Sequence, residues 1–72
     1  MAEIRFFGYL SELAGTRRME VPLERPRTLR KLVPSSFAEA NCIILINQRV
    51  GTLDSEITDQ DSVAFMPILS GG

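Results

Sequence analysis

Two strand-like segments at opposite ends of the chain constrain its fold more than any other feature. Residues Ala2–Phe7 alternate apolar and polar side chains, which places Ala2, Ile4 and Phe6 on one face of a strand. Residues 62–68 form a second strand-like segment that is also rich in large apolar side chains. A right-handed crossover through a helix would bring the two segments together as a parallel pair. The pattern therefore predicts a sheet whose first and last strands lie at its centre.

Shorter elements fill the space between these ends. A single helical turn is expected over Tyr9–Ala14, and Gly15 ends it as a C-cap-type residue. The alternation resumes in Arg17–Leu23, which predicts a return strand antiparallel to the first. The nearly continuous apolar run Cys42–Ile46 is typical of a strand buried on both faces. The remaining elements are a turn at Asn47-Gln48, its hairpin partner Arg49–Gly51, the apolar residues Leu53 and Ile57, and a turn over Thr58–Asp61.

The helical region is expected to be interrupted. Thr28 can N-cap a short helix with an apolar stripe of Leu29, Leu32 and Val33. Pro34 cannot continue that helix, and Ser36 with Glu39 has the spacing of a capping box for a second turn. One helical layer across a mixed sheet of four to five strands is an α+β domain, which can just bury a sufficient core at 72 residues.

Composition excludes several classes of function. The chain has one cysteine, Cys42, and no histidine, so we expect no internal disulfide, no metal-ligand cluster and no histidine-assisted nucleophile. Cys42 itself is expected to be a small core residue and not a sulfur relay. Asp59 and Asp61 fit turn formation better than a cation loop. No apolar stretch is long enough for a membrane span or a signal peptide, which predicts a cytoplasmic protein.

Charge is unevenly distributed along the chain. Residues 1–36 carry a net charge of +3 and residues 37–72 carry −4. The basic half lacks the strong positive balance and aromatic spacing of a nucleic-acid binder, so no direct nucleic-acid partner is expected. The acidic half could still guide docking onto a basic protein partner. Lys31 is the sole lysine.

The chain ends in Ser70-Gly71-Gly72, directly after the last apolar segment. Two glycines form a thin, adaptable strip that can enter a narrow cleft, since neither carries a Cβ. We therefore expect a folded domain over residues 1–68 and a flexible, reactive tail over residues 69–72. The terminal carboxylate of Gly72 is the group that another enzyme could activate.

Large apolar side chains near this tail predict a partner surface. If Ile4 and Phe6 face the helical layer, Phe7 points to the opposite side, and Met66 does so on the last strand. Phe7 and Met66 would then stand outward beside Ile68 and Leu69. Exposed apolar groups gathered in this way mark interaction sites, and methionine adapts to different contacts.

Four segments, read in order, resemble the β-grasp, ubiquitin-like sulfur carriers, the family of molybdopterin synthase small subunits. They are Ile4–Phe7, Leu10–Thr16 (a L-x-E-L-x-G-T turn), Thr58–Pro67 (a T-D-G-D-x-V-A-F-x-P element) and Ser70–Gly72. Together they cover about a third of the chain. Gln60 departs from the glycine common in that family, and Pro34 shortens a helix that is normally longer.

The resemblance implies a function in which the tail is the working group. An ATP-using adenylyltransferase of the ubiquitin-activating type would adenylate the Gly72 carboxylate, and a persulfide would convert it into a thiocarboxylate. Ser70 and Gly71 would lie extended in the channel of that enzyme. The large subunit of molybdopterin synthase would then receive the tail, with Phe7 and Met66 in contact with it, and sulfur would pass to a pterin precursor. The chain itself would bind no cofactor, since ATP belongs to its activating partner.

Three alternatives remain at this point. Thiamine-pathway sulfur carriers share the fold and the tail but usually lack the L-x-E-L-x-G-T segment and the proline at the position of Pro67. A ubiquitin-like modifier would be conjugated through Gly72 to lysines of target proteins, or would supply sulfur for tRNA thiolation. An interaction module with an inert tail is the third alternative.

Overall fold

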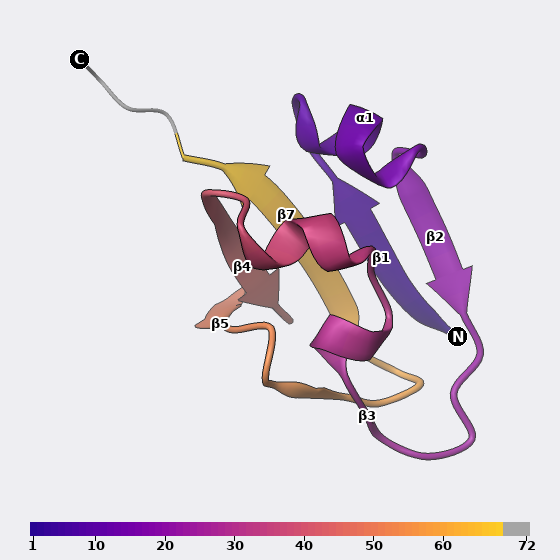
Figure 1. Cartoon of the computed structure of the whole chain (residues 1–72). Helices are drawn as coiled ribbons and strands as arrows, with labels where there is room; N and C mark the ends of the chain where they lie inside the picture. The colour runs from indigo at the N-terminus through magenta and orange to yellow at the C-terminus, as the bar shows by residue number, and fades with distance from the viewer. Residues whose placement is uncertain (69–72) are drawn as a thin grey trace.

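The computed structural model describes residues 1–68 and shows one mixed sheet covered on one face (Figure 1). Five strands pair in the order β2-β1-β7-β4-β5, and a separate two-stranded ladder joins β3 to β6. The elements, in chain order, are β1 (Ala2–Phe6), α1 (Leu10–Ala14), β2 (Arg18–Val21), β3 (Arg27–Thr28), η1 (Leu29–Lys31), η2 (Ser35–Ala38), β4 (Cys42–Ile46), β5 (Arg49–Gly51), β6 (Glu56–Ile57) and β7 (Ser62–Pro67). The expected α+β architecture is confirmed.

The first and last strands pair in parallel at the centre of the sheet, as predicted. In the β1–β7 register Ile4 lies opposite Val63 and Phe6 opposite Phe65. All four side chains are buried and face the helical layer. The return strand β2 pairs antiparallel with β1, and β4 pairs antiparallel with β7. The two ends of the chain therefore form the part of the sheet that is buried most completely.

The local turns follow the sequence closely. Gly15 ends α1 in a left-handed conformation with φ of 80°. Asn47 and Gln48 also have positive φ values, 52° and 68°, which joins β4 to β5 by a tight hairpin turn. At the last turn the Asp61 carboxylate accepts a hydrogen bond from the Thr58 backbone N–H at 2.8 Å. The short ladder between β3 and β6 was not anticipated.

The helical layer is smaller than the sequence suggested. Between Thr28 and Ala40 the helical structure consists of two 3-10 segments, η1 with three residues and η2 with four, which lie on either side of Pro34 because a proline cannot continue a helix. Thr28 does stand at the N-cap of η1, but its side chain makes no capping hydrogen bond. The predicted capping box of Ser36 and Glu39 is wrong, since Pro34 occupies the N-cap and Ser36 lies inside η2.

Among the residues that the structure describes, ten buried apolar residues form the core between the sheet and this thin layer. Three of them are aromatic: the ring centroids of Phe6, Phe37 and Phe65 lie 5.0–5.3 Å from one another. The other members are Ala2, Ile4, Leu10, Leu29, Ile44, Ile57 and Val63. Phe37 from η2 caps the two central strands, and large aromatic side chains compensate for a helical layer of few residues. Within residues 1–68, no helix is both long and apolar enough to cross a membrane.

Candidate functional site

An apolar row crosses the uncovered face of the sheet at the end where β7 finishes. The register places Met66 opposite Ile43 of β4, and Phe7 follows Phe6 at the position beside Met66. The Phe7 N–H donates to the carbonyl of Phe65 at 2.9 Å, which extends the parallel ladder by one residue. Exposed fractions are 44% for Phe7, 39% for Met66 and 43% for Ile43. The three side chains form a surface, called the open-face row below, that remains accessible in the isolated chain.

Ile43 is the member of this row that sequence reasoning missed. Its segment was expected to be buried on both faces, and that prediction is wrong, because Ile44 is buried while its neighbour Ile43 is exposed. The relevant signal was already present in the sequence. A chain with one short helical region can cover only one face of its sheet, so alternate residues of an apolar strand must remain uncovered.

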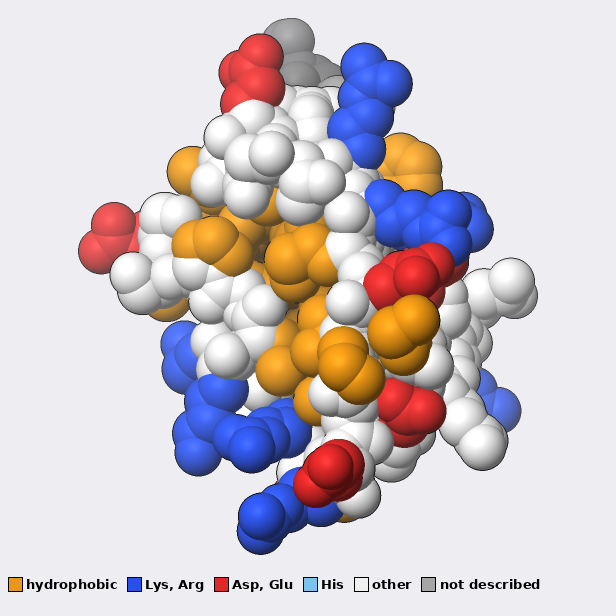
Figure 2. Space-filling model, turned by 90° about the vertical axis from the view of Figure 1, so that its right-hand side faces the viewer, with side chains coloured by type: hydrophobic (Ala, Val, Ile, Leu, Met, Phe, Trp, Pro, Cys, Tyr) orange, Lys and Arg blue, Asp and Glu red, His pale blue; other side chains and the backbone are white. Residues whose placement is uncertain are grey.

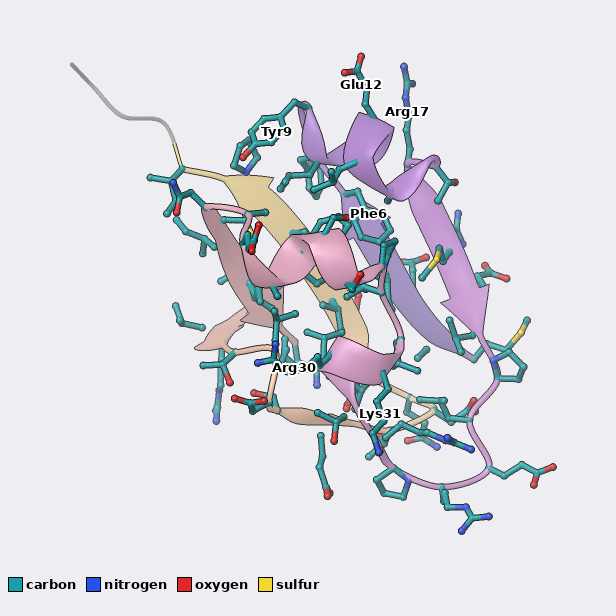
Figure 3. The ribbon with its side chains drawn as sticks, viewed as in Figure 1. Phe6, Tyr9, Glu12, Arg17, Arg30 and Lys31 are labelled. Carbon is teal, nitrogen blue, oxygen red and sulfur yellow. The ribbon has the colours of Figure 1, made fainter. Side chains whose placement is uncertain are left out.

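The base of the tail is held in place by contacts from two other segments. Gly8 has φ of 60°, and a Cβ built on it would lie 3.0 Å from Cγ of Pro67. Asn41 accepts two long hydrogen bonds at its carbonyl oxygen, from the Ile68 N–H at 3.5 Å and from the Tyr9 hydroxyl at 3.4 Å. Figure 3 shows Tyr9 at the end of the molecule where β7 finishes, with Phe6 pointing into the interior. The last described residues therefore lie against two segments, the one between β1 and α1 and the one before β4.

The predicted site residues divide into two groups. Phe7, Met66 and Ile68 are exposed at this end of the molecule, as expected, and Ile68 is 53% accessible. Leu69, Ser70, Gly71 and Gly72 lie outside the described residues, so their predicted roles stay predictions.

A charged network borders the open-face row. Glu3 bonds to Arg5 at 2.9 Å and to Arg18 at 2.8 Å, and Arg18 also bonds to Glu20 at 2.6 Å. A groove of about 430 Å³ runs between this network and Phe7, and Gly8, Ser11 and Arg17 contribute to its lining. The apolar row therefore has a polar rim on the β2 side, the usual composition of a transient protein interface.

Catalytic chemistry has little support in the described residues. Burial raises the pKa of the Cys42 thiol, which reduces the thiolate needed for sulfur transfer. Cys42 also packs against the core, as a small apolar residue would. Within residues 1–68, no three metal-ligating side chains are grouped as a candidate ion site. Asp61 instead holds a turn: hydrogen bonds from the Thr58 amide and from Asn47 lower its pKa.

The sheet has five strands, and the first and last strands in sequence pair in parallel at its centre. This sheet, with one thin helical layer on one face and the other face uncovered, defines the β-grasp class of small domains. Two solved structures share this fold. A molybdopterin converting factor subunit 1 from Pyrococcus furiosus, described as putative, superposes with a TM-score of 0.68 and 23% identity, over 93% of this chain and 97% of that one. SAMP1 from Haloferax volcanii superposes with a TM-score of 0.71 and 22% identity, over 99% and 98% of the two chains.

Sequence comparison gives the family directly. The model of the ThiS family matches residues 4–72, and the chain therefore belongs to the ThiS family. The molybdopterin synthase sulfur carrier subunit of Escherichia coli (strain K12) is 30% identical over an alignment of 81 positions, gaps included, which spans 100% of both chains. Membership of the sulfur-carrier family, first indicated by four short segments, is thus confirmed.

Proposed function

We propose that this chain is the sulfur carrier subunit of a molybdopterin synthase. The observation that carries the proposal is the match to a molybdopterin synthase sulfur carrier subunit, which covers the whole length of that relative. The terminal Ser70-Gly71-Gly72 and the apolar surface beside the base of the tail agree with it. A protein of this size need supply only a positioned carboxylate and a docking surface, because the reacting partner supplies the catalytic groups.

The reaction proceeds at the Gly72 carboxylate. An ATP-using partner of the ubiquitin-activating type forms the acyl adenylate and releases pyrophosphate, because a free carboxylate is a poor acyl donor. A persulfide sulfur attacks the acyl carbon and AMP leaves. A thiol of the sulfur-donating protein then cleaves the new S–S bond, which yields a disulfide on that protein and a thiocarboxylate on Gly72. The tail next enters the large synthase subunit and donates this sulfur to a pterin precursor.

The domain positions the tail for both encounters. Phe7, Met66, Ile68 and Leu69 contact the partner protein, while Ser70 and Gly71 lie in its channel. A side chain at Gly71 would obstruct that channel, since glycine is the residue that lets a backbone approach most closely. Pro67 lies close to Gly8, and the Ile68 N–H donates a long hydrogen bond to the Asn41 carbonyl. The tail therefore starts from a segment that lies against the domain, which reduces the entropic cost of docking it.

Mass spectrometry of the intact chain tests the proposal. After incubation with the activating enzyme, ATP and a sulfur donor, one oxygen of Gly72 should be replaced by sulfur. A chain lacking Gly72 is the control and should stay unmodified. The modified chain should then convert a pterin precursor when mixed with the large subunit, and a plain carboxylate that persists would contradict the proposal.

The same activated carboxylate could instead acylate an amine, which defines the second candidate, a ubiquitin-like modifier. The related structure of SAMP1 shows the shared fold. Recovery of Gly72 in isopeptide linkage to lysines of cellular proteins would favour this candidate. A requirement for the chain in tRNA thiolation, with molybdopterin synthesis intact, would place its sulfur in another pathway.

A further inference from the structure

The free edge of the sheet at β2 carries a self-complementary charge pattern. β2 is a terminal strand of the five-stranded sheet, so within residues 1–68 one side of its backbone has no strand partner. Along it the side chains read Arg18-Met19-Glu20. Arg18 and Glu20 lie on the uncovered face with Glu3, while Met19 lies opposite Ile4 on the helical side.

The backbone N–H and C=O groups of β2 point alternately toward β1 and toward the free edge. The Phe6 N–H donates to the Arg17 carbonyl at 2.9 Å, so residues at odd positions of β2 direct their polar groups toward β1. Arg18 and Glu20 therefore direct theirs outward. The Thr16 hydroxyl engages those of Arg18, donating to the Arg18 carbonyl at 2.9 Å and accepting from the Arg18 N–H at 3.3 Å. The longer bond is weak, which leaves the edge open to a stronger strand partner.

We infer that β2 pairs antiparallel with β2 of a second copy of this chain, about a two-fold axis through Met19. In this register Arg18 of each copy lies opposite Glu20 of the other, and the outward N–H and C=O groups of both residues bond across the axis. Opposite charges at facing positions stabilise a strand pair. The arrangement is isologous and closed, so it makes a dimer and no fibre.

Other registers are less favourable for physical reasons. Centring the pair on Glu20 places two like charges face to face, which is destabilising. A shift by one residue turns every side chain to the opposite face and mismatches the backbone groups. The other free edge, β5, carries Arg49 and Gly51 around Val50 and offers no complementary charge.

The surroundings of β2 also suit a second copy. Met19 and Val21 are only partly buried, since the 3-10 layer does not cover this flank completely. Figure 2 views the molecule from this side and shows hydrophobic side chains gathered at its middle, with Lys and Arg side chains above and below. Pairing at β2 would leave the open-face row free, because β7 lies at the other side of β1. Such a short edge predicts a weak dimer, with a dissociation constant in the micromolar to millimolar range.

Sedimentation equilibrium of the full chain over micromolar to millimolar concentrations tests the inference. The wild type should dimerise, and Glu20→Arg should raise the dissociation constant about tenfold or more, because it sets two arginines against each other. Glu39→Arg, which makes the same change in charge at the C-cap of η2, should leave the dissociation constant unchanged. The exchange Arg18→Glu with Glu20→Arg should restore dimerisation, and in that variant the arginine at position 20 lies opposite Glu3. A wild type that stays monomeric, or an exchange that fails to restore, would overturn the inference.

A covalent trap reads the register without depending on charge. Facing residues at the axis have Cβ atoms close enough for a disulfide. Met19→Cys in a Cys42→Ser background should therefore form a crosslinked dimer on mild oxidation, whereas Val21→Cys in the same background should not. Equal crosslinking of both variants would rule out the Met19-centred register. The test involves no sulfur transfer, so its result is separate from that of the proposed function.

Discussion

Phe6 and Phe7 are chemically identical neighbours that serve opposite faces of one sheet. Phe6 is 3% exposed and packs between Phe37 and Phe65, whereas Phe7 is 44% exposed on the uncovered face. The helical layer has enough residues to cover one face only. The comparison therefore shows that the limited size of the chain leaves an apolar surface beside the base of the tail.

The largest expected effect separates these two phenylalanines. Phe6→Ala should lower the free energy of unfolding by about 3–5 kcal/mol, because it removes an aromatic ring from a packed cluster. Phe7→Ala should lower it by less than about 1 kcal/mol, since most of that ring is not packed. Urea denaturation of both variants measures the difference.

The affinity for the large synthase subunit should rank the two variants in the reverse order: among folded molecules, Phe7→Ala should weaken binding more than Phe6→Ala. Phe7→Ala should weaken it about tenfold or more, as expected for an aromatic residue central to an interface. If Phe6→Ala and Phe7→Ala lowered the free energy of unfolding by similar amounts, the covered and uncovered faces of the sheet would not differ in packing.

The second prediction concerns the contact that fixes the base of the tail. Gly8→Ala should cost about 1–3 kcal/mol, because a positive φ disfavours a Cβ and because this Cβ would press on Pro67. Gly15→Ala is a matched control: its φ is also positive, at 80°, but a Cβ there would meet nothing within 4 Å.

The control should lose only the conformational part, about 1 kcal/mol. Thermal unfolding gives both values, and thiocarboxylate formation should slow for Gly8→Ala alone. Equal rates in the two variants would show that the position of Pro67 does not matter to the tail.

The same contrast explains which parts of the fold could be predicted. The Gly15 cap and the Asn47-Gln48 turn follow from local patterns that the structure keeps. The parallel pairing of β1 with β7 joins distant residues, and it followed from the order of the elements and the handedness of the crossover. The outward position of Phe7 and Met66 followed from strict alternation along their strands.

The wrong or missing predictions concern contacts between elements that lie far apart in the sequence. Whether Cys42–Ile46 is covered on both faces depends on how much helix forms, and Pro34 limits that helix by an amount no local pattern gives. Ile43 was missed for this reason. The β3–β6 ladder likewise joins residues about thirty positions apart, beyond the range of a local signal.

The third prediction tests Ile43 as part of the open-face row. Ile43→Ser should weaken binding of the large subunit severalfold, because it removes an apolar contact beside Met66. Its effect on stability should stay within about 1 kcal/mol, since the side chain is already 43% exposed.

Val50→Ser is the matched control on the same sheet, at its edge and 81% exposed. Calorimetric titration against the large subunit should give an unchanged affinity for this variant. Loss of affinity in both variants would extend the row to β5, and loss in neither would remove Ile43 from it.

The smallest expected effect lies at the opposite end of β7, where a carboxylate holds a turn. Hydrogen bonds from the Thr58 amide and from Asn47 lower the pKa of Asp61 below its ordinary value of 3.8 in the folded chain. The ionised form is therefore the one that folding favours. Its contribution is present above the unfolded pKa and is lost as the pH falls through the lower folded pKa.

Asp61→Asn, which keeps the shape but not the charge, should be less stable than the wild type by about 1 kcal/mol at neutral pH. The difference should shrink as the pH falls below 3.8, since the wild-type carboxyl then also becomes neutral. Urea midpoints measured between neutral and strongly acidic pH give this difference directly. Asp59, whose pKa is lowered mainly by the Leu23 amide, remains in the variant, so some acid sensitivity should persist. If the difference in stability between the wild type and Asp61→Asn stays constant with pH, Asp61 contributes through its shape alone. The turn at the far end of β7 would then depend on packing, as the buried face of the sheet does.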